Sequence, residues 1–123
     1  MNEFTINEGK LRIIQEVVPA REISLAHIIA HPDDIIYVKL GLDPNIDYKQ
    51  AAIGVLSLSP AETAIIAGDV AMKSSEVQMG FLDRFAGTLI LTGTLASVEA
   101  SLIGIMNYMQ NELGYTVCKI TRT

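Results

Sequence analysis

The order of the predicted elements in the second part of the chain constrains its fold most. In chain order they are strand 51–58, helix 60–74, strand 77–83, strand 88–92, helix 95–113 and strand 115–121. This is the order of the split βαβ, or ferredoxin-like, arrangement, which packs two helices on one face of an antiparallel sheet. The sequence therefore predicts an α+β fold with a ferredoxin-like antiparallel sheet and helices on one face.

The first part of the chain predicts an addition to this core. Residues 10–18 and 22–30 are rich in β-branched side chains and are expected to be strands. Pro32, followed by two aspartates, opens a short helix that Gly41 ends. Residues 42–50 are then a linker loop, since they contain proline and asparagine and lack an apolar period.

The start of the first long helix carries a local signal. Ser59, Pro60 and Glu62 match a capping box, with serine at the N-cap, proline at the first helical position and glutamate at the third. Further along, Asp69 and Lys73 stand four residues apart and are expected to pair. The face expected to pack closely consists of Ala61, Ala64, Ile65, Gly68, Ala71 and Met72.

The composition indicates a single domain that associates with others. Of its 123 residues, 50% are hydrophobic, and the mean hydropathy is +0.34. A chain of this size buries only about two-thirds of its unfolded surface. The apolar surplus therefore predicts a surface that partner molecules cover.

Charge and cysteine content exclude several classes of partner and compartment. A net charge of −5, with 9 Lys and Arg and no basic run, argues against nucleic-acid binding. The single cysteine, Cys118, allows no internal disulfide and suits a reducing compartment. Because no apolar run approaches the ~20 residues of a membrane span, and the polar start is no signal peptide, we expect a soluble cytoplasmic protein without membrane partners.

Candidate chemistry is sparse. His27 and His31 are the two histidines, and they are expected in a strand and the turn after it, so a metal site would need further ligands. Asp33 and Asp34 are nearby but are explained by the helix start. Cys118 is expected to be a buried, inert thiol. With no nucleophile, base or phosphate-binding glycine loop in a recognisable pattern, we expect no catalytic, cofactor or metal site and no enzyme activity.

One segment of the chain stands out against this quiet background. The stretch MGFLDRFAG, residues 79–87, predicts a hairpin with Asp83, Arg84 and Phe85 at its tip. One interpretation is a solvated turn with an adjacent ion pair. The other is a protein contact or pore rim, where arginine and aromatic residues are enriched. Composition alone does not separate the two.

Five segments carry a resemblance to a known family. They are IIQEVVP (13–19), SLAHIIAHP (24–32), LSPAETAIIAGDVAMKS (58–74), MGFLDRFAG (79–87) and CKITRT (118–123). In this order they resemble the circularly permuted type of bacterial microcompartment (BMC) shell protein, and the resemblance spans nearly the whole chain.

The resemblance implies a fold and an assembly. Residues 22–123 would form a circularly permuted BMC domain and residues 1–21 an N-terminal extension. The protein would be a cyclic homohexamer, without cofactors, that tiles with other shell proteins around encapsulated enzymes. Strands from six extensions would gather into a β-barrel over the central pore; here that strand would consist of Ile13, Ile14, Gln15, Glu16 and Val17.

The resemblance also implies roles for two further sets of residues. The hairpin would line an occluded central pore through Leu82, Asp83, Arg84, Phe85, Ala86 and Gly87. Contacts between neighbouring hexamers would use Lys73, with His31 in the place where relatives often have arginine. The alternative from another functional class is a regulatory domain that senses a small ligand on the same ferredoxin-like scaffold.

Overall fold

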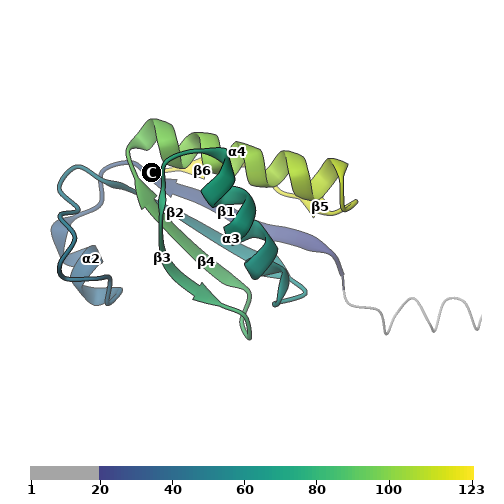
Figure 1. Cartoon of the computed structure of the whole chain (residues 1–123), viewed down its shortest axis with the longest axis horizontal. Helices are drawn as coiled ribbons and strands as arrows, with labels where there is room; N and C mark the ends of the chain where they lie inside the picture. Colours follow the sequence, from purple (N-terminus) through teal and green to yellow (C-terminus); the bar gives the residue numbers. More distant parts are fainter. Residues whose placement is uncertain (1–19) are drawn as a thin grey trace, which may run out of the picture.

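The computed structural model of the chain describes residues 20–123. The predicted barrel strand, from Ile13 to Val17, lies outside these residues. The described part is a six-stranded sheet with α3 and α4 on one face (Figure 1). Its elements are β1 (Glu22–Ile29), α2 (Asp34–Lys39), β2 (Ala52–Ser59), α3 (Thr63–Ser74), β3 (Gln78–Asp83), β4 (Thr88–Gly93), α4 (Leu95–Asn111), β5 (Thr116–Val117) and β6 (Thr121–Arg122).

The sheet is mixed, and the prediction of a purely antiparallel sheet is wrong. The strand order is β3-β4-β2-β1-β5, with β6 also paired to β1. β1 runs antiparallel to β2 but parallel to β5 and β6. The first strand is therefore not an addition at the margin of a ferredoxin-like sheet, because it lies between β2 and the final strands. Its apolar residues Ile23, Ala26 and Ile28 complete the core beneath α4.

The final strand forms in two pieces. A single strand was predicted over residues 115–121, but β5 and β6 each contain two residues, separated by Cys118 to Ile120. The amide of Cys118 still donates to the Ile23 carbonyl oxygen at 3.2 Å. Residues 116–122 thus run beside β1, but they form regular strand pairs only near the two ends of β1.

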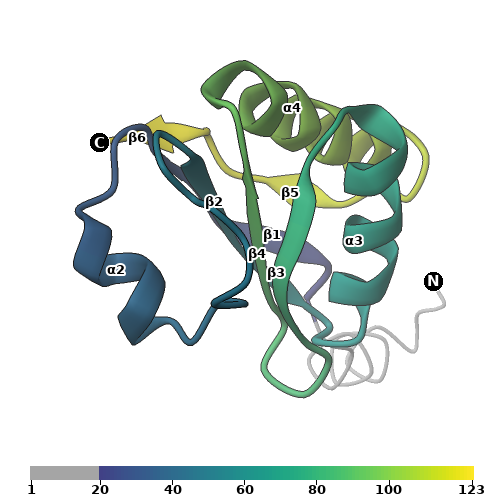
Figure 2. The same cartoon turned by 60° about the vertical axis from the view of Figure 1, so that its left-hand side comes forward.

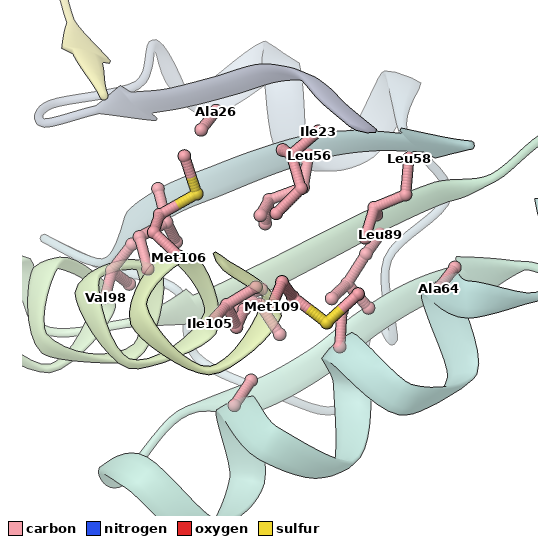
Figure 3. Packing of buried hydrophobic residues seen from close by; sticks show 14 of the residues in the cluster. Ile23, Ala26, Leu56, Leu58, Ala64, Leu89, Val98, Ile105, Met106 and Met109 are labelled. Atoms are coloured by element: carbon pink, nitrogen blue, oxygen red, sulfur yellow. The ribbon is translucent and has the colours of Figure 1, made fainter. Parts of the chain in front are cut away.

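The main core fills the space between the sheet and α3 and α4 (Figure 3). The helix predicted over residues 95–113 forms as α4, in which Val98, Leu102, Ile105 and Met109 are fully buried. The side chain of Thr94 caps α4 by accepting from the Ser97 amide at 3.1 Å. A β-carbon at position 54 would stand 2.9 Å from the side chains of Leu102 and Val98, so glycine in β2 allows α4 to approach the sheet closely.

The first long helix begins later than predicted, and its capping box does not form. Ser59 is the last residue of β2, opposite Glu22, so it is not available as an N-cap. The Glu62 side chain makes no cap hydrogen bond. The first turn is instead closed by Thr63, whose amide and hydroxyl donate to the Pro60 carbonyl oxygen at 3.0 and 2.6 Å.

The buried face of α3 differs in part from the predicted one. The described helix buries Ala64, Gly68 and Ala71 as expected. Ile65 and Met72 were predicted on the same face, but they are 49% and 48% exposed. About half of each of these two side chains is thus left uncovered by the rest of residues 20–123.

The opposite face of the sheet carries a second, smaller core. Figure 2 shows α2 on the side of the sheet away from α3 and α4, so the prediction of helices on one face holds only for the two long helices. Tyr37 of α2 packs with Leu42 against Ile53 and Ile90. Its hydroxyl donates to the Ala51 carbonyl oxygen at 2.6 Å. Alternate residues of β2 and β4 point to this face, and their apolar side chains require this cover.

Candidate functional site

The hairpin between β3 and β4 is held in shape by Asp83. One oxygen of its carboxylate accepts from the amides of Phe85 and Ala86 at 2.8 and 3.1 Å. The adjacent ion pair of the first interpretation does not form between Asp83 and Arg84. The guanidinium lies over the Phe85 ring, with Cζ 4.9 Å from the ring centroid. Phe85 itself is 82% exposed. The tip therefore displays an aromatic ring and a cation on a turn that its own carboxylate stabilises.

Gly87 attaches this hairpin to the neighbouring strand. It adopts φ +81°, and a β-carbon there would meet the Leu58 carbonyl oxygen. Its amide donates to the Asp83 carbonyl oxygen, and its own carbonyl oxygen accepts from the Leu58 amide, both at 2.8 Å. The tip is thus fixed to the end of β2 and is not a free loop. Leu82, the first residue assigned to the pore, is half-buried beneath α3.

The chain enters the described domain at the same end of the sheet. Glu22 of β1 is opposite Ser59, while Ser57 is opposite Thr88, which in turn pairs with Asp83 at the base of the hairpin. The described part of the chain, which starts at residue 20, therefore begins at the end of the sheet that carries the hairpin tip.

The residues assigned to contacts between hexamers lie at the other end of the sheet. Lys73 is in the last turn of α3, just before β3 starts, and its Nζ donates to Asp69 Oδ2 at 2.8 Å. The predicted pair with Asp69 is confirmed. This hydrogen bond and the carboxylate charge raise the pKa of Lys73 above its ordinary value. His31 follows the end of β1 and is exposed. In the described chain the partner of Lys73 is Asp69 and not His31.

His27 has a structural role that the sequence did not reveal. Its Nδ1 lies 2.6 Å from the Thr121 hydroxyl and its Nε2 lies 2.8 Å from the Thr123 hydroxyl. Because His27 and Thr121 are opposite each other on parallel strands, the imidazole connects β6 to β1. The position of His27 in a strand was predicted, and its side chain is half-buried there. Its partners could be identified only once the register of two strands distant in sequence was known.

The described residues offer little for catalysis or metal binding. Within residues 20–123, His, Cys, Asp and Glu form no group of three that could hold a metal ion. In the same range, no helix has the length and apolar character needed to cross a membrane. An open hollow of about 560 Å³ lies between the 46–51 loop and the end of α3, and its wall includes Tyr48, Met72 and Gln78. It holds no nucleophile paired with a base.

Comparison with known proteins agrees with this geometry. The BMC domain family matches residues 52–121. The chain is 44% identical to the bacterial microcompartment shell protein EutS of Salmonella typhimurium over 115 residues, which cover 94% of this chain and 99% of EutS. It is 46% identical to the shell protein CutR of Streptococcus intermedius over 116 residues, covering 94% and 96% of the two chains.

The chain belongs to the bacterial microcompartment shell protein family. A solved structure described as a flat hexamer of CutR superimposes with a TM-score of 0.80 at 45% identity, over 91% of this chain and 99% of that chain. The predicted family is therefore confirmed. This shell protein has a structural function, and it is located in the shell of a bacterial microcompartment.

Proposed function

We propose that this shell protein forms a cyclic hexamer that tiles, with other shell proteins, into a facet of the microcompartment and performs no catalysis. The observation that carries the proposal is the similarity to the CutR flat hexamer along 99% of that chain. Large apolar side chains that are exposed in the single copy support it, since a tile must cover its rim. The enzymes enclosed by the shell are further partners of the facet.

The hairpin from Leu82 to Gly87 lines the central pore of this hexamer. Support comes from the rigid turn around Asp83 and from the exposure of Phe85. Because the tip protrudes and its own hydrogen bonds hold it in one conformation, six copies can meet around one axis. Six phenyl rings and six guanidinium groups at that axis occlude the opening.

The domain is circularly permuted relative to other BMC domains. In support, the family match begins at residue 52, the start of β2, and leaves out β1 and α2. Yet β1 lies inside the sheet and pairs with β2, β5 and β6. Circular permutation has this effect: it moves a strand that the core needs, here β1, to a position before the rest of the domain in the sequence.

The extension 1–21 supplies a barrel above the pore. Six copies of the strand formed by Ile13, Ile14, Gln15, Glu16 and Val17 close into a small parallel barrel. The entry of the chain at the end of the sheet that carries the hairpin supports this, because it delivers all six extensions to the same axis. Removing residues 1–18 would then abolish the barrel but leave the hexamer intact.

Contacts between hexamers use Lys73, with His31 beside it. The exposure of Lys73, whose side chain is 74% accessible, and its place at the end of α3 opposite the hairpin support this role. Histidine is shorter than arginine, so these contacts are weaker than those that an arginine at the same position would make.

The test of this function is the mass of the purified protein by light scattering, with negative-stain images of the same sample. Six-fold rings or ordered sheets are the expected result. A dimer with no higher assembly would overturn the proposal. The same measurements on a protein lacking residues 1–18 test the barrel separately from the tile. Six-fold rings are expected to remain, and monomers would contradict the barrel assignment.

A further inference from the structure

The open hollow of about 560 Å³ beside the 46–51 loop has an acidic wall. Three places in the sequence form it: this loop, the turn between α3 and β3, and the link from β4 to α4. Its charged residues are Asp47 and Glu76, and no lysine, arginine or histidine of residues 20–123 lines it. A concave surface that carries charge of one sign attracts solutes of the opposite sign.

The lysines closest in sequence to these carboxylates do not neutralise the hollow. The Nζ of Lys73 is hydrogen-bonded to Asp69, and Lys73 does not line the wall. Lys49 lines a smaller neighbouring hollow that shares Asp47, but it is absent from this wall. Within residues 20–123 neither Asp47 nor Glu76 forms an ion pair. Both carboxylates are therefore open to a cation from outside the described chain.

Thr92 of β4 adds a buried polar group to the same wall. It is 2% exposed, and because its neighbour Leu91 points into the main core, Thr92 points to the opposite face and into the hollow. Within residues 20–123 its hydroxyl has no hydrogen-bond partner, whereas the hydroxyls of Ser75 and Thr94 in this wall both bond the backbone of Ser97. A buried hydroxyl without a partner is unfavourable, so this one is available to a bound molecule.

The remainder of the wall is largely apolar and includes Tyr48 and Met72. The Tyr48 ring is stacked on Tyr37, with centroids 5.2 Å apart and planes at 9°, and the Tyr37 hydroxyl is bonded to the Ala51 carbonyl oxygen. Tyr48 is thus held in place, and an aromatic ring attracts cations as well as carbon chains. The hollow combines negative charge, a buried hydroxyl and apolar area, which together match an amphipathic cation.

We propose that this hollow binds an organic ammonium group, with its charge facing Asp47 and Glu76 and its carbon chain against Tyr48 and Met72. The Thr92 hydroxyl accepts a hydrogen bond from the ammonium. A free alkylamine and a lysine side chain of another protein molecule present the same chemistry. A metal ion fits less well, because two carboxylates fall short of the six to eight oxygen ligands that Ca²⁺ takes and the apolar wall would be left without a partner.

Titration of the full-length protein with n-butylammonium chloride at constant ionic strength tests the proposal. Isotope-labelled methionine methyl groups report binding by NMR. The Met72 methyl should shift and saturate, with weak affinity because both carboxylates are exposed to water. Met109, fully buried in the main core, is the internal reference. n-Butanol has the same carbon chain without the charge and should shift Met72 much less. An equal response to n-butanol, or a shift that does not saturate, would overturn the proposal.

Substitutions of the two carboxylates test the origin of the affinity. Glu76→Gln and Asp47→Asn should each weaken binding by about two- to fivefold, the range for one exposed charge pair. Asp43→Asn is the matched control. Asp43 accepts from the amide two residues further on at 2.9 Å, as Asp47 does, but it does not line the hollow. The control should bind like the unmodified protein, and equal affinity in all three variants would overturn the proposal.

Thr92→Val separates binding from a role in folding. Because the hydroxyl has no partner among the described residues, its removal should not lower the Tm of the free protein, yet it should weaken the binding of n-butylammonium. A lower Tm with unchanged binding would show that the hydroxyl serves the fold, and would overturn its assignment to the site.

Negative-stain images identify the source of the ammonium, a step that rests on the proposed tile. Sheets of hexamers that fall apart in saturating n-butylammonium, but not in NaCl of the same ionic strength, assign the site to a lysine side chain of a neighbouring molecule. Sheets that persist assign it to a free amine. Hexamers that do not bind the probe would overturn this inference alone, whereas a dimeric protein that binds it would overturn the tile alone.

Discussion

The amide of Leu58 donates to the carbonyl oxygen of Gly87 at 2.8 Å, and this hydrogen bond joins the end of β2 to the hairpin tip. The approach is close enough that a side chain at position 87 would collide with the backbone of Leu58. The hairpin assigned to the pore is thus positioned by a strand from the centre of the sheet. Its placement in an assembly depends on the fold of the whole domain.

Replacing Gly87 with alanine should destabilise the protein strongly. The new β-carbon meets the Leu58 carbonyl, and φ +81° is unfavourable for alanine. Together these effects should lower the free energy of unfolding by about 2–4 kcal/mol, measured by urea denaturation. Gly41→Ala is the control: φ is +69° but nothing lies within 4 Å, so strain alone acts and about 1 kcal/mol should be lost. Equal losses would contradict the collision.

Ser101 should be sensitive to removal of its hydroxyl. It is fully buried between α3 and α4, where its Oγ lies 2.8 Å from Ser75 Oγ and donates to the Ala71 carbonyl oxygen at 3.1 Å. Ser101→Ala removes both contacts, while the Ser75 hydroxyl keeps its hydrogen bond to the Ser97 carbonyl oxygen at 2.6 Å, and the change should cost about 1–2 kcal/mol. Thermal unfolding monitored by circular dichroism measures it. The exposed Ser24→Ala, whose hydroxyl contact is 3.4 Å long, should change little.

Lys73→Ala should leave hexamers intact and abolish sheets or tubes of hexamers in negative-stain images. The residue is exposed and its partner Asp69 lies on the same helix, so the fold does not require it. Its raised pKa keeps the ammonium charged up to strongly alkaline pH, because a cation whose folded pKa is raised loses its contribution only as pH rises through that value. Sheets that form normally from this variant would remove Lys73 from the edge contact.

His27→Phe should loosen β6 and spare the rest of the domain. The phenyl ring keeps the size of the imidazole but cannot hydrogen-bond the hydroxyls of Thr121 and Thr123. Hydrogen exchange should then accelerate at the Thr123 amide, which donates to the Ile28 carbonyl oxygen at 2.9 Å. The amides of β4 serve as an internal reference. Unchanged exchange at Thr123 would show that backbone pairing alone holds β6.

Features with a local cause were predictable from the sequence. The helix over 95–113 follows from the helical period of its apolar residues, and the pairing of Asp69 with Lys73 follows from their spacing. The hairpin from Met79 to Gly87 was located correctly between two strands. In each case the residues that determine the structure are neighbours along the chain, so a short window contains the information.

Features determined by distant partners were not predictable in this way. Ser59 and Glu62 match a helix cap locally, but pairing of Ser59 with Glu22 extends β2 and moves the start of the helix to Thr63. Local sequence also does not predict that Arg84 turns to Phe85 instead of Asp83, because the backbone amides of the turn compete for that carboxylate. Strand order and the choice among hydrogen-bond acceptors depend on the complete fold.

The position of β1 between β2 and the two final strands has a consequence for how the protein is made. Residues 22–28 are synthesised early, yet their partners at 116–122 emerge from the ribosome almost a whole domain later. Until then one side of β1 lacks its neighbour, and its hydrogen-bonding groups on that side have no strand to pair with. The sheet of each subunit is therefore completed only after residues 116–122 have been synthesised.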